Sequence, residues 1–106
     1  MVRALGALRP AEDVLYVADS AAAPYGDKPP ADVLARVLAI GGFLQDEGCK
    51  ALVVACNTAT AVALEALRTQ LAIPVIGMEP ALKPAAEHTA SGVVAVLATA
   101  GTLASG

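Results

Sequence analysis

The sequence predicts an α/β fold built around a parallel sheet. Helical and strand-like segments alternate along the chain, the strand-like segments are apolar at consecutive positions, and polar residues follow several of them. Strands covered by helices on both faces have such continuous apolar runs, and helices between parallel strands form right-handed crossovers. We therefore expect the polar strand ends to meet at the carboxyl edge of the sheet, where ligands bind in such folds.

The first half of the chain predicts two helices and one strand. Residues 2–8 carry apolar side chains at a spacing of three, which indicates a short helix. Residues 14–17 are apolar and rich in β-formers, so we expect a strand there, followed by a proline-containing loop at 19–30. An amphipathic pattern over 31–47 predicts a helix, and Gly48 is placed to end it.

The second half repeats the alternation of strand and helix. The expected elements are, in order, a strand at 51–55, a helix at 59–71, a strand in "IPVIG", a helix in "MEPALKPAAEHTA", a strand at 92–97 and the start of a helix in "ATAGTLASG". Pro84 lies either in a first helical turn or at a kink, because proline cannot donate a backbone hydrogen bond.

Composition excludes several classes of function. The chain has 106 residues, enough for one domain, and its net charge of −3 and near absence of aromatic residues argue against nucleic acid and anionic membranes as partners. No apolar run is long enough for a membrane span, and two cysteines do not make a disulfide framework. Because nothing else suggests secretion, we expect a cytoplasmic protein. We expect no metal, because no Cys/His spacing fits a zinc site, and nucleotide-binding motifs are missing too.

The stretch "LVVACNTATA" carries the strongest candidate for chemistry. Cys56 lies where a strand ends and a helix begins, and backbone N–H groups at a helix N-terminus favour negative charge, which suits a reactive thiolate. Asn57 and Thr58 could bind a carboxylate or cap the helix. The alternative is a buried, inert Cys56 with Asn57 as the helix cap, and the residues alone leave both interpretations open.

Cys49 is not a partner for Cys56 in a disulfide or a metal site. It precedes the same strand, so the two thiols are expected to lie on the order of 20 Å apart. A hydrolase or acyltransferase using Cys56 would need a nearby base, and the single histidine, His88, lies in a later helical segment and is expected to be solvated.

Two other polar segments follow predicted strands. Tyr25 lies in a tight turn between Pro24 and Gly26, and Thr99 and Thr102 follow the last apolar run. These residues could bind a polar ligand, or they could be an ordinary turn and an ordinary start of a helix.

Four segments together resemble the first half of bacterial glutamate racemases. They are, in order, "VLYVADSAAAPYG", "ALVVACNTATAVALEALR", "IPVIGMEPALKPA" and "VVAVLATAGTLAS". The "ACNTA" element is shared more widely with aspartate/glutamate-type racemases, and the resemblance covers essentially the whole chain. It implies a doubly wound, flavodoxin-like parallel sheet, with residues 1–106 forming a partial N-terminal domain that lacks the family's first strand and second domain.

The resemblance also implies a function and a set of site residues. Members of this family interconvert L- and D-glutamate without a cofactor, supplying D-glutamate for peptidoglycan, and use two opposed thiols to remove and return the α-proton. Cys56 is similar to the thiol that acts on the D-enantiomer. The residues that the resemblance assigns to substrate binding are Pro24, Tyr25, Gly26, Asn57, Thr58, Thr99 and Thr102.

The departures from the family pattern are large. The family's first strand ends in Asp-Ser-Gly-Val-Gly-Gly, and the pair Asp19-Ser20 belongs to the second strand, so Asp19 is not assigned the catalytic aspartate's role. The second thiol is not matched, so we expect no racemase activity from this chain alone. The family's first strand is not matched either, which leaves two strand edges unpaired, so we expect self-association. The alternatives are a non-catalytic carboxylate-binding or oligomerising α/β module, or a racemase for aspartate or hydantoin-type substrates.

Overall fold

The computed structural model describes residues 1–79 and 81–104. The elements are, in chain order, α1 (Val2–Leu8), the 3-10 turn η1 (Ser20–Ala22), α2 (Pro30–Asp46), β1 (Leu52–Val54), α3 (Asn57–Gln70), β2 (Val75–Gly77), α4 (Leu82–His88) and α5 (Ala100–Leu103). The predicted helices over 78–90 and 98–106 correspond to α4 and α5. Pro80 in the first of these segments and residues 105–106 in the second lie outside the described residues.

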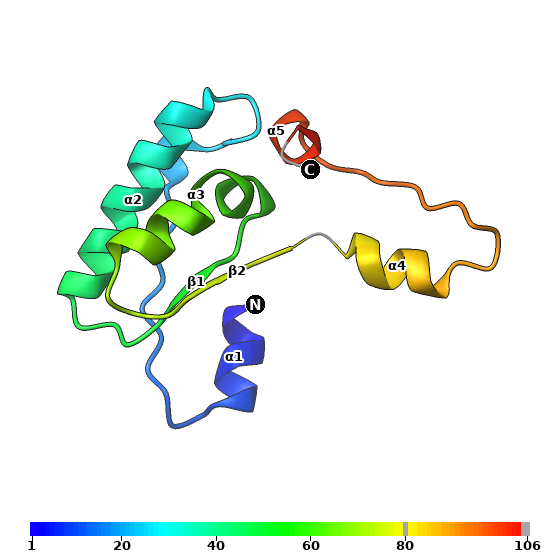
Figure 1. The fold of residues 1–106 in the computed structure, drawn as a ribbon. Coiled ribbons are helices and arrows are strands. Elements are labelled where there is room, and N and C mark those ends of the chain that lie inside the picture. The colour runs from blue at the N-terminus through cyan, green and yellow to red at the C-terminus, as the bar shows by residue number, and fades with distance from the viewer. Residues whose placement is uncertain (80, 105–106) are drawn as a thin grey trace.

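The described sheet consists of β1 and β2, which run parallel to each other with Leu52 opposite Val75 and Val54 opposite Gly77. Helix α3 connects the two strands, as a parallel pair requires (Figure 1). The predicted fold class, an α/β fold with a parallel sheet, is therefore confirmed, and so are the strands predicted at 51–55 and in "IPVIG".

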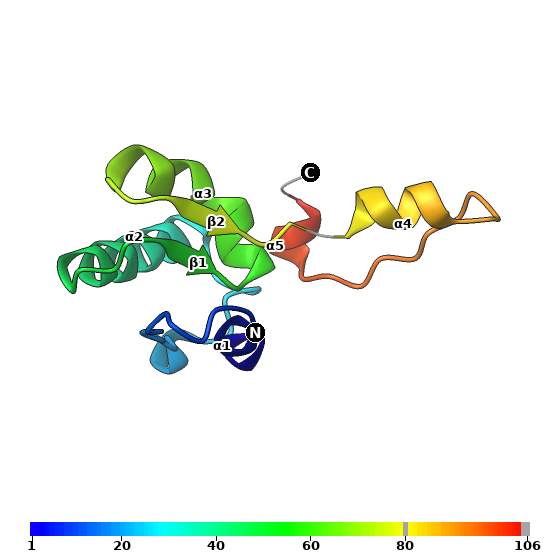
Figure 2. The same ribbon diagram turned by 90° about the horizontal axis from the view of Figure 1, so that it is seen from below.

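Helix α3 covers one face of the sheet and also packs against α2, whereas α1 lies on the opposite side of the strands (Figure 2). The centre of this packing is Leu67 and Ala63 on α3, both fully buried. Gly41 lets α2 approach closely, because a Cβ atom at this position would lie 2.7 Å from a terminal carbon of Leu67. The buried core residues are Val33, Val37, Leu44, Leu52, Val54, Ala59, Ala63, Leu67 and Val75.

Both ends of α2 follow from local sequence. Pro30 occupies its first turn, where a missing N–H costs nothing. At the other end Gly48 adopts a positive φ of 81°, its N–H donates to the Gln45 carbonyl, and the Cys49 N–H donates to the Leu44 carbonyl. These two bonds form a Schellman motif, so the predicted stop at Gly48 is confirmed.

The strands predicted at 14–17 and 92–97 are wrong for the described structure. Both segments are extended but neither takes part in a strand ladder, and their apolar side chains are exposed, up to complete exposure at Leu97. Apolar β-formers create a preference for an extended backbone, but a strand also needs the hydrogen bonds of a neighbouring strand. Figure 1 shows the second of these segments in an arm with α4 that extends away from the sheet.

No helix within the described residues is long and apolar enough to cross a membrane.

Truncation of Leu67 tests the centre of the core. Leu67→Ala should lower the free energy of unfolding by about 2–5 kcal/mol, because it leaves a cavity between α3, α2 and the sheet. Leu8→Ala is the control, since Leu8 is 76% exposed on α1 and its loss should change the free energy by less than about 0.5 kcal/mol. Chemical denaturation measures both, and equal effects would contradict this description of the core.

Candidate functional site

Cys56 lies directly before the first residue of α3, at the carboxyl end of β1. It is the N-cap residue, its backbone is extended, and no side chain caps the helix. The first intrahelical bond runs from the Thr60 N–H to the Cys56 carbonyl, so the amides of Asn57, Thr58 and Ala59 have no acceptor within the helix. Cys56 and Asn57 are exposed, which contradicts the alternative of a buried cysteine with Asn57 as the cap.

The start of α3 is fixed by hydrogen bonds of Thr60. The buried Thr60 hydroxyl donates to the Val54 carbonyl at 3.3 Å and accepts from the Met78 N–H at 3.0 Å. It therefore joins the carboxyl ends of β1 and β2 to the first turn of α3. Gly77 provides the room for this contact, because a Cβ atom there would lie 2.5 Å from the Thr60 methyl group.

Three threonine hydroxyls from two distant parts of the chain meet beside this helix start. Thr58 is buried, and its hydroxyl lies 2.9 Å from that of Thr99 and 3.4 Å from that of Thr102, while the last two are 3.1 Å apart. Thr99 also caps α5 by accepting from the Thr102 N–H. We call these three residues the threonine cluster. Each hydroxyl has one proton that can rotate toward an acceptor, so the cluster can donate hydrogen bonds to an anion.

The turn at residues 24–26 is the third predicted part of the site. Gly26 faces the threonine cluster closely, since a Cβ atom on it would lie 2.8 Å from the Thr99 methyl carbon. Pro24 is exposed and follows a cis peptide bond, whereas Tyr25 is half-buried and packs against the core. The predicted convergence of three polar strand ends is therefore present in the structure, although the segments at 14–17 and 92–97 are not strands.

Asp19, Tyr25 and Arg36 form a second polar group, which we call the Asp19 cluster. The Tyr25 hydroxyl donates to Asp19 Oδ2 at 2.6 Å. The Arg36 guanidinium donates through Nε to Oδ2 and through a terminal nitrogen to Oδ1, both at 2.5 Å. Arg36 belongs to the polar side of the amphipathic pattern over 31–47, which predicts exposure to solvent, and nothing in the sequence pointed to a partner 17 residues away.

Ionisation in the Asp19 cluster follows from these bonds. Hydrogen bonds from Arg36 and then from Tyr25 lower the pKa of Asp19 to about 2. Partial burial, followed by the bond to Asp19, raises the pKa of Tyr25 to about 12. Because the folded-state pKa of Asp19 is depressed, its contribution to stability is present above the ordinary value of 3.8 and is lost as pH falls through about 2.

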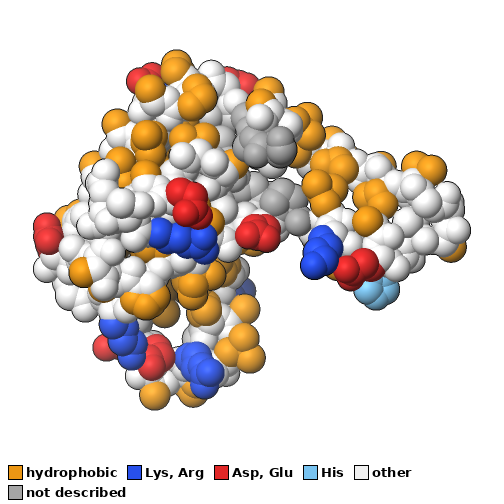
Figure 3. Space-filling view, viewed as in Figure 1, with side chains coloured by type: hydrophobic (Ala, Val, Ile, Leu, Met, Phe, Trp, Pro, Cys, Tyr) orange, Lys and Arg blue, Asp and Glu red, His pale blue; other side chains and the backbone are white. Residues whose placement is uncertain are grey.

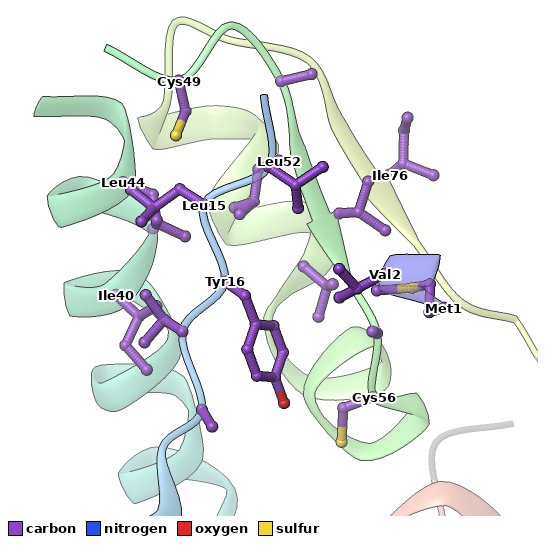
Figure 4. A pocket seen from close by; sticks show the side chains of 18 of the residues that line it. Met1, Val2, Leu15, Tyr16, Ile40, Leu44, Cys49, Leu52, Cys56 and Ile76 are labelled. Carbon is purple, nitrogen blue, oxygen red and sulfur yellow. The ribbon is translucent and has the colours of Figure 1, made fainter. Parts of the chain in front are cut away.

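Two cavities border the site residues. The smaller, of about 290 Å³, is lined by Tyr25, Lys28, Pro30, Val33, Thr58, Ala61, Val62 and Ala104. The larger, of about 820 Å³, lies between β1, α2, α1 and the extended segment at 14–17, and Cys56, Tyr25 and Asp19 are among its lining residues. Figure 4 shows Cys56 and Cys49 at opposite ends of β1, as predicted from the length of the strand.

His88, the single histidine, is not among the lining residues of either cavity. His88 is exposed at the end of α4, where its ring Nδ1 lies 2.8 Å from the Pro84 carbonyl oxygen. Among the described residues, no group of three His, Cys, Asp or Glu side chains could hold a metal ion.

Comparisons with known proteins identify the family of this chain. The model of the Asp/Glu/Hydantoin racemase family matches residues 1–106. Glutamate racemase from Cupriavidus pinatubonensis is 58% identical over 106 residues, and that from Ralstonia nicotianae is 57% identical over 105. The match covers 100% and 99% of this chain but only 39% and 38% of those two proteins, so the chain spans about two-fifths of their length.

Solved structures give the same result for the fold. A crystal structure of Escherichia coli glutamate racemase in complex with L-glutamate and the activator UDP-MurNAc-Ala matches with a TM-score of 0.87 and 44% identity, over 94% of this chain and 38% of that one. Glutamate racemase from Bacillus anthracis matches with a TM-score of 0.84 and 38% identity, over 98% of this chain and 40% of that one. The chain belongs to the Asp/Glu/Hydantoin racemase family.

Proposed function

We propose that this chain is part of an enzyme that racemises glutamate, and that it supplies the carboxylate-binding groups and one of two proton-transferring thiols. The observation that carries the proposal is the meeting of the threonine cluster with the uncapped start of α3, next to Cys56. The glutamate racemases that match the chain, one of them solved with L-glutamate, support glutamate as the substrate.

Binding of the substrate is assigned to groups that favour anions. The free amides at the start of α3 present partial positive charge, and the threonine cluster adds rotatable hydroxyl donors beside them. Asn57 adds an exposed amide at the first helical position. The turn at residues 24–26 closes this region through the contact of Gly26 with Thr99. A substrate with two carboxylates can therefore be held by a protein whose net charge is −3.

Cys56 is assigned to proton transfer. In this proposal its thiolate removes the α-proton of D-glutamate, and the electron pair left on the α-carbon takes a proton from an acid on the opposite face. Cys49 is not that acid, because it lies at the other end of β1 (Figure 4). Racemisation needs two opposed groups in a site closed to water, so the second acid must come from outside the described residues. The enzyme needs no cofactor for this chemistry, and its product would supply peptidoglycan synthesis in the cytoplasm.

Self-association is the second part of the proposal. Two extended apolar segments, at 14–17 and 92–97, lack strand partners, and Ile76 on β2 is 55% exposed. Figure 3 shows hydrophobic side chains exposed at the surface of the α4 arm and of the region around α1. Open edges and apolar patches of this kind pair with other chains, so copies of this chain are expected to associate.

A non-catalytic carboxylate-binding module is the second candidate function. It is favoured by the presence of one thiol, Cys56, beside the threonine cluster among the described residues. A racemase that acts on aspartate or a hydantoin is a further alternative within the same family. Binding profiles with glutamate, aspartate and a hydantoin distinguish these substrates.

Glutamate binding tests the threonine cluster. Thr58→Val should weaken binding at least about tenfold, because a hydrogen bond to a charged group contributes about 1.5–3 kcal/mol. Thr69→Val is the matched control on the same helix, since the Thr69 hydroxyl bonds to the Glu65 carbonyl away from the cluster. Calorimetry measures both affinities. Equal affinities for the two variants, or no glutamate binding by the unsubstituted chain, would contradict the assignment.

The activity of the chain tests the role of Cys56. We expect no interconversion of L- and D-glutamate in a coupled assay, because only one of the two proton-transferring groups is present. Turnover that Cys56→Ser abolishes would show that the chain is a complete enzyme. Exchange of the α-proton of D-glutamate in heavy water that disappears in Cys56→Ser would support the proposed half-reaction, whereas binding without exchange favours the non-catalytic module.

Self-association is tested by sedimentation over a range of concentrations. The sedimentation coefficient should rise with concentration, and Leu97→Lys should reduce this rise because Leu97 is completely exposed in the unpaired segment. Ala86→Lys, on an exposed position of α4, is the control for the added charge. A monomer at every concentration would exclude association through these segments.

A further inference from the structure

We propose that Arg36 is a positioning residue: it holds Asp19 so that Asp19 binds the Tyr25 hydroxyl and fixes the turn at residues 24–26 against the threonine cluster. The inference rests on the proposed function only in taking this turn to be part of the substrate site. The observations behind it are the hydrogen bonds of the Asp19 cluster.

Both oxygens of the Asp19 carboxylate accept hydrogen bonds in this arrangement. Oδ1 accepts from Arg36, and Oδ2 accepts from both Arg36 and Tyr25. Asp19 is also the N-cap residue of η1, but its side chain makes no capping bond there. Both oxygens are therefore free for the two partners, and the planar guanidinium fixes the direction in which Oδ2 points toward the phenol.

The position of Arg36 is set by the core. Arg36 lies on α2 between Val33 and Val37, which are 1% and 8% exposed and pack in the central cluster. Because helix α2 cannot rotate without unpacking these side chains, the backbone of Arg36 is held in place, and its guanidinium reaches Asp19 from there. The core therefore positions Arg36, Arg36 positions the carboxylate of Asp19, and Asp19 positions the hydroxyl of Tyr25.

Tyr25 transmits this support to the candidate site. Its ring packs against the core and borders both cavities, including the smaller one next to Thr58. The next residue, Gly26, makes the close approach to Thr99. A displaced Tyr25 would therefore move the backbone that faces the threonine cluster.

The ion pair is too exposed to serve mainly for stability. The Arg36 side chain is 46% exposed, so water screens the pair and its contribution to the free energy of unfolding is small. The ion pair acts mainly on geometry, because it sets the direction in which the two acceptor oxygens of Asp19 point. Removal of Arg36 should therefore change the environment of Tyr25 while leaving the thermal midpoint nearly unchanged.

The test reads the hydrogen bond of Tyr25 directly. In a Tyr16→Phe background Tyr25 is the only tyrosine, and the intensity ratio of the tyrosine Fermi doublet in ultraviolet resonance Raman spectra reports how strongly its hydroxyl donates. The variants are Arg36→Ala and Asp19→Asn. Arg68→Ala is the control, because Arg68 forms a comparable pair with Glu65 on α3 and is 48% exposed.

The proposal predicts that Arg36→Ala changes the doublet in the same direction as Asp19→Asn, and that Arg68→Ala does not change it. If Asp19 held Tyr25 without help, removal of Arg36 would leave the strong donor signal in place or strengthen it, because the carboxylate would lose a competing donor. That result overturns the proposal. Circular dichroism of each variant shows that the comparison is made between folded chains.

Glutamate affinity separates this inference from the proposed function. A several-fold loss of affinity in Arg36→Ala, with none in Arg68→Ala, supports a turn positioned for substrate. An altered tyrosine doublet with unchanged affinity supports the role of Arg36 in holding Tyr25 and contradicts the assignment of the turn to substrate binding. Because the spectroscopic measurement needs no glutamate, either part can fail without the other.

Discussion

The packing of α3 against α2 and the two strands is the constraint on which the rest of the structure depends. Leu67 and Ala63 are completely buried at this junction, and Gly41 allows the close approach of α2. This packing fixes the axis of α3, and the bonds of Thr60 to the ends of β1 and β2 fix where the helix begins. The positions of Cys56, Asn57 and Thr58 follow from it, because they are consecutive residues at that beginning.

The residues of the candidate site are held in place in two different ways. Cys56 and Thr58 are held by the core through α3. Thr99 and Thr102 reach the site at the end of an arm whose α4 has no buried residue, so their place depends on hydrogen bonds to Thr58 and on the contact with Gly26. Most of the preorganisation of the site therefore comes from α3, which the core holds in place.

Local patterns predicted the helices well because their causes are local. The amphipathic spacing over 31–47, the prolines before it and Gly48 after it correspond closely to α2 (Pro30–Asp46) and its Schellman motif. The strands at 14–17 and 92–97 were wrong because apolar β-formers cannot supply a neighbouring backbone. Arg36 was missed as a member of the Asp19 cluster for a similar reason, since a helix pattern separates core from solvent but does not identify a distant carboxylate.

The sequence by itself determined the α/β class, the alternation of elements and the place of Cys56 at the start of a helix, because these depend on residue periodicity and on turn chemistry within a few residues. The tertiary structure alone decided that Cys56 is exposed, that three threonine hydroxyls meet, and that Asp19 bonds to both Tyr25 and Arg36. The bonds of Asp19 to Tyr25 and Arg36 join residues 6 and 17 positions apart, and the bonds of Thr58 to Thr99 and Thr102 join residues 41 and 44 positions apart. Only the packing of the chain brings such residues within hydrogen-bond distance.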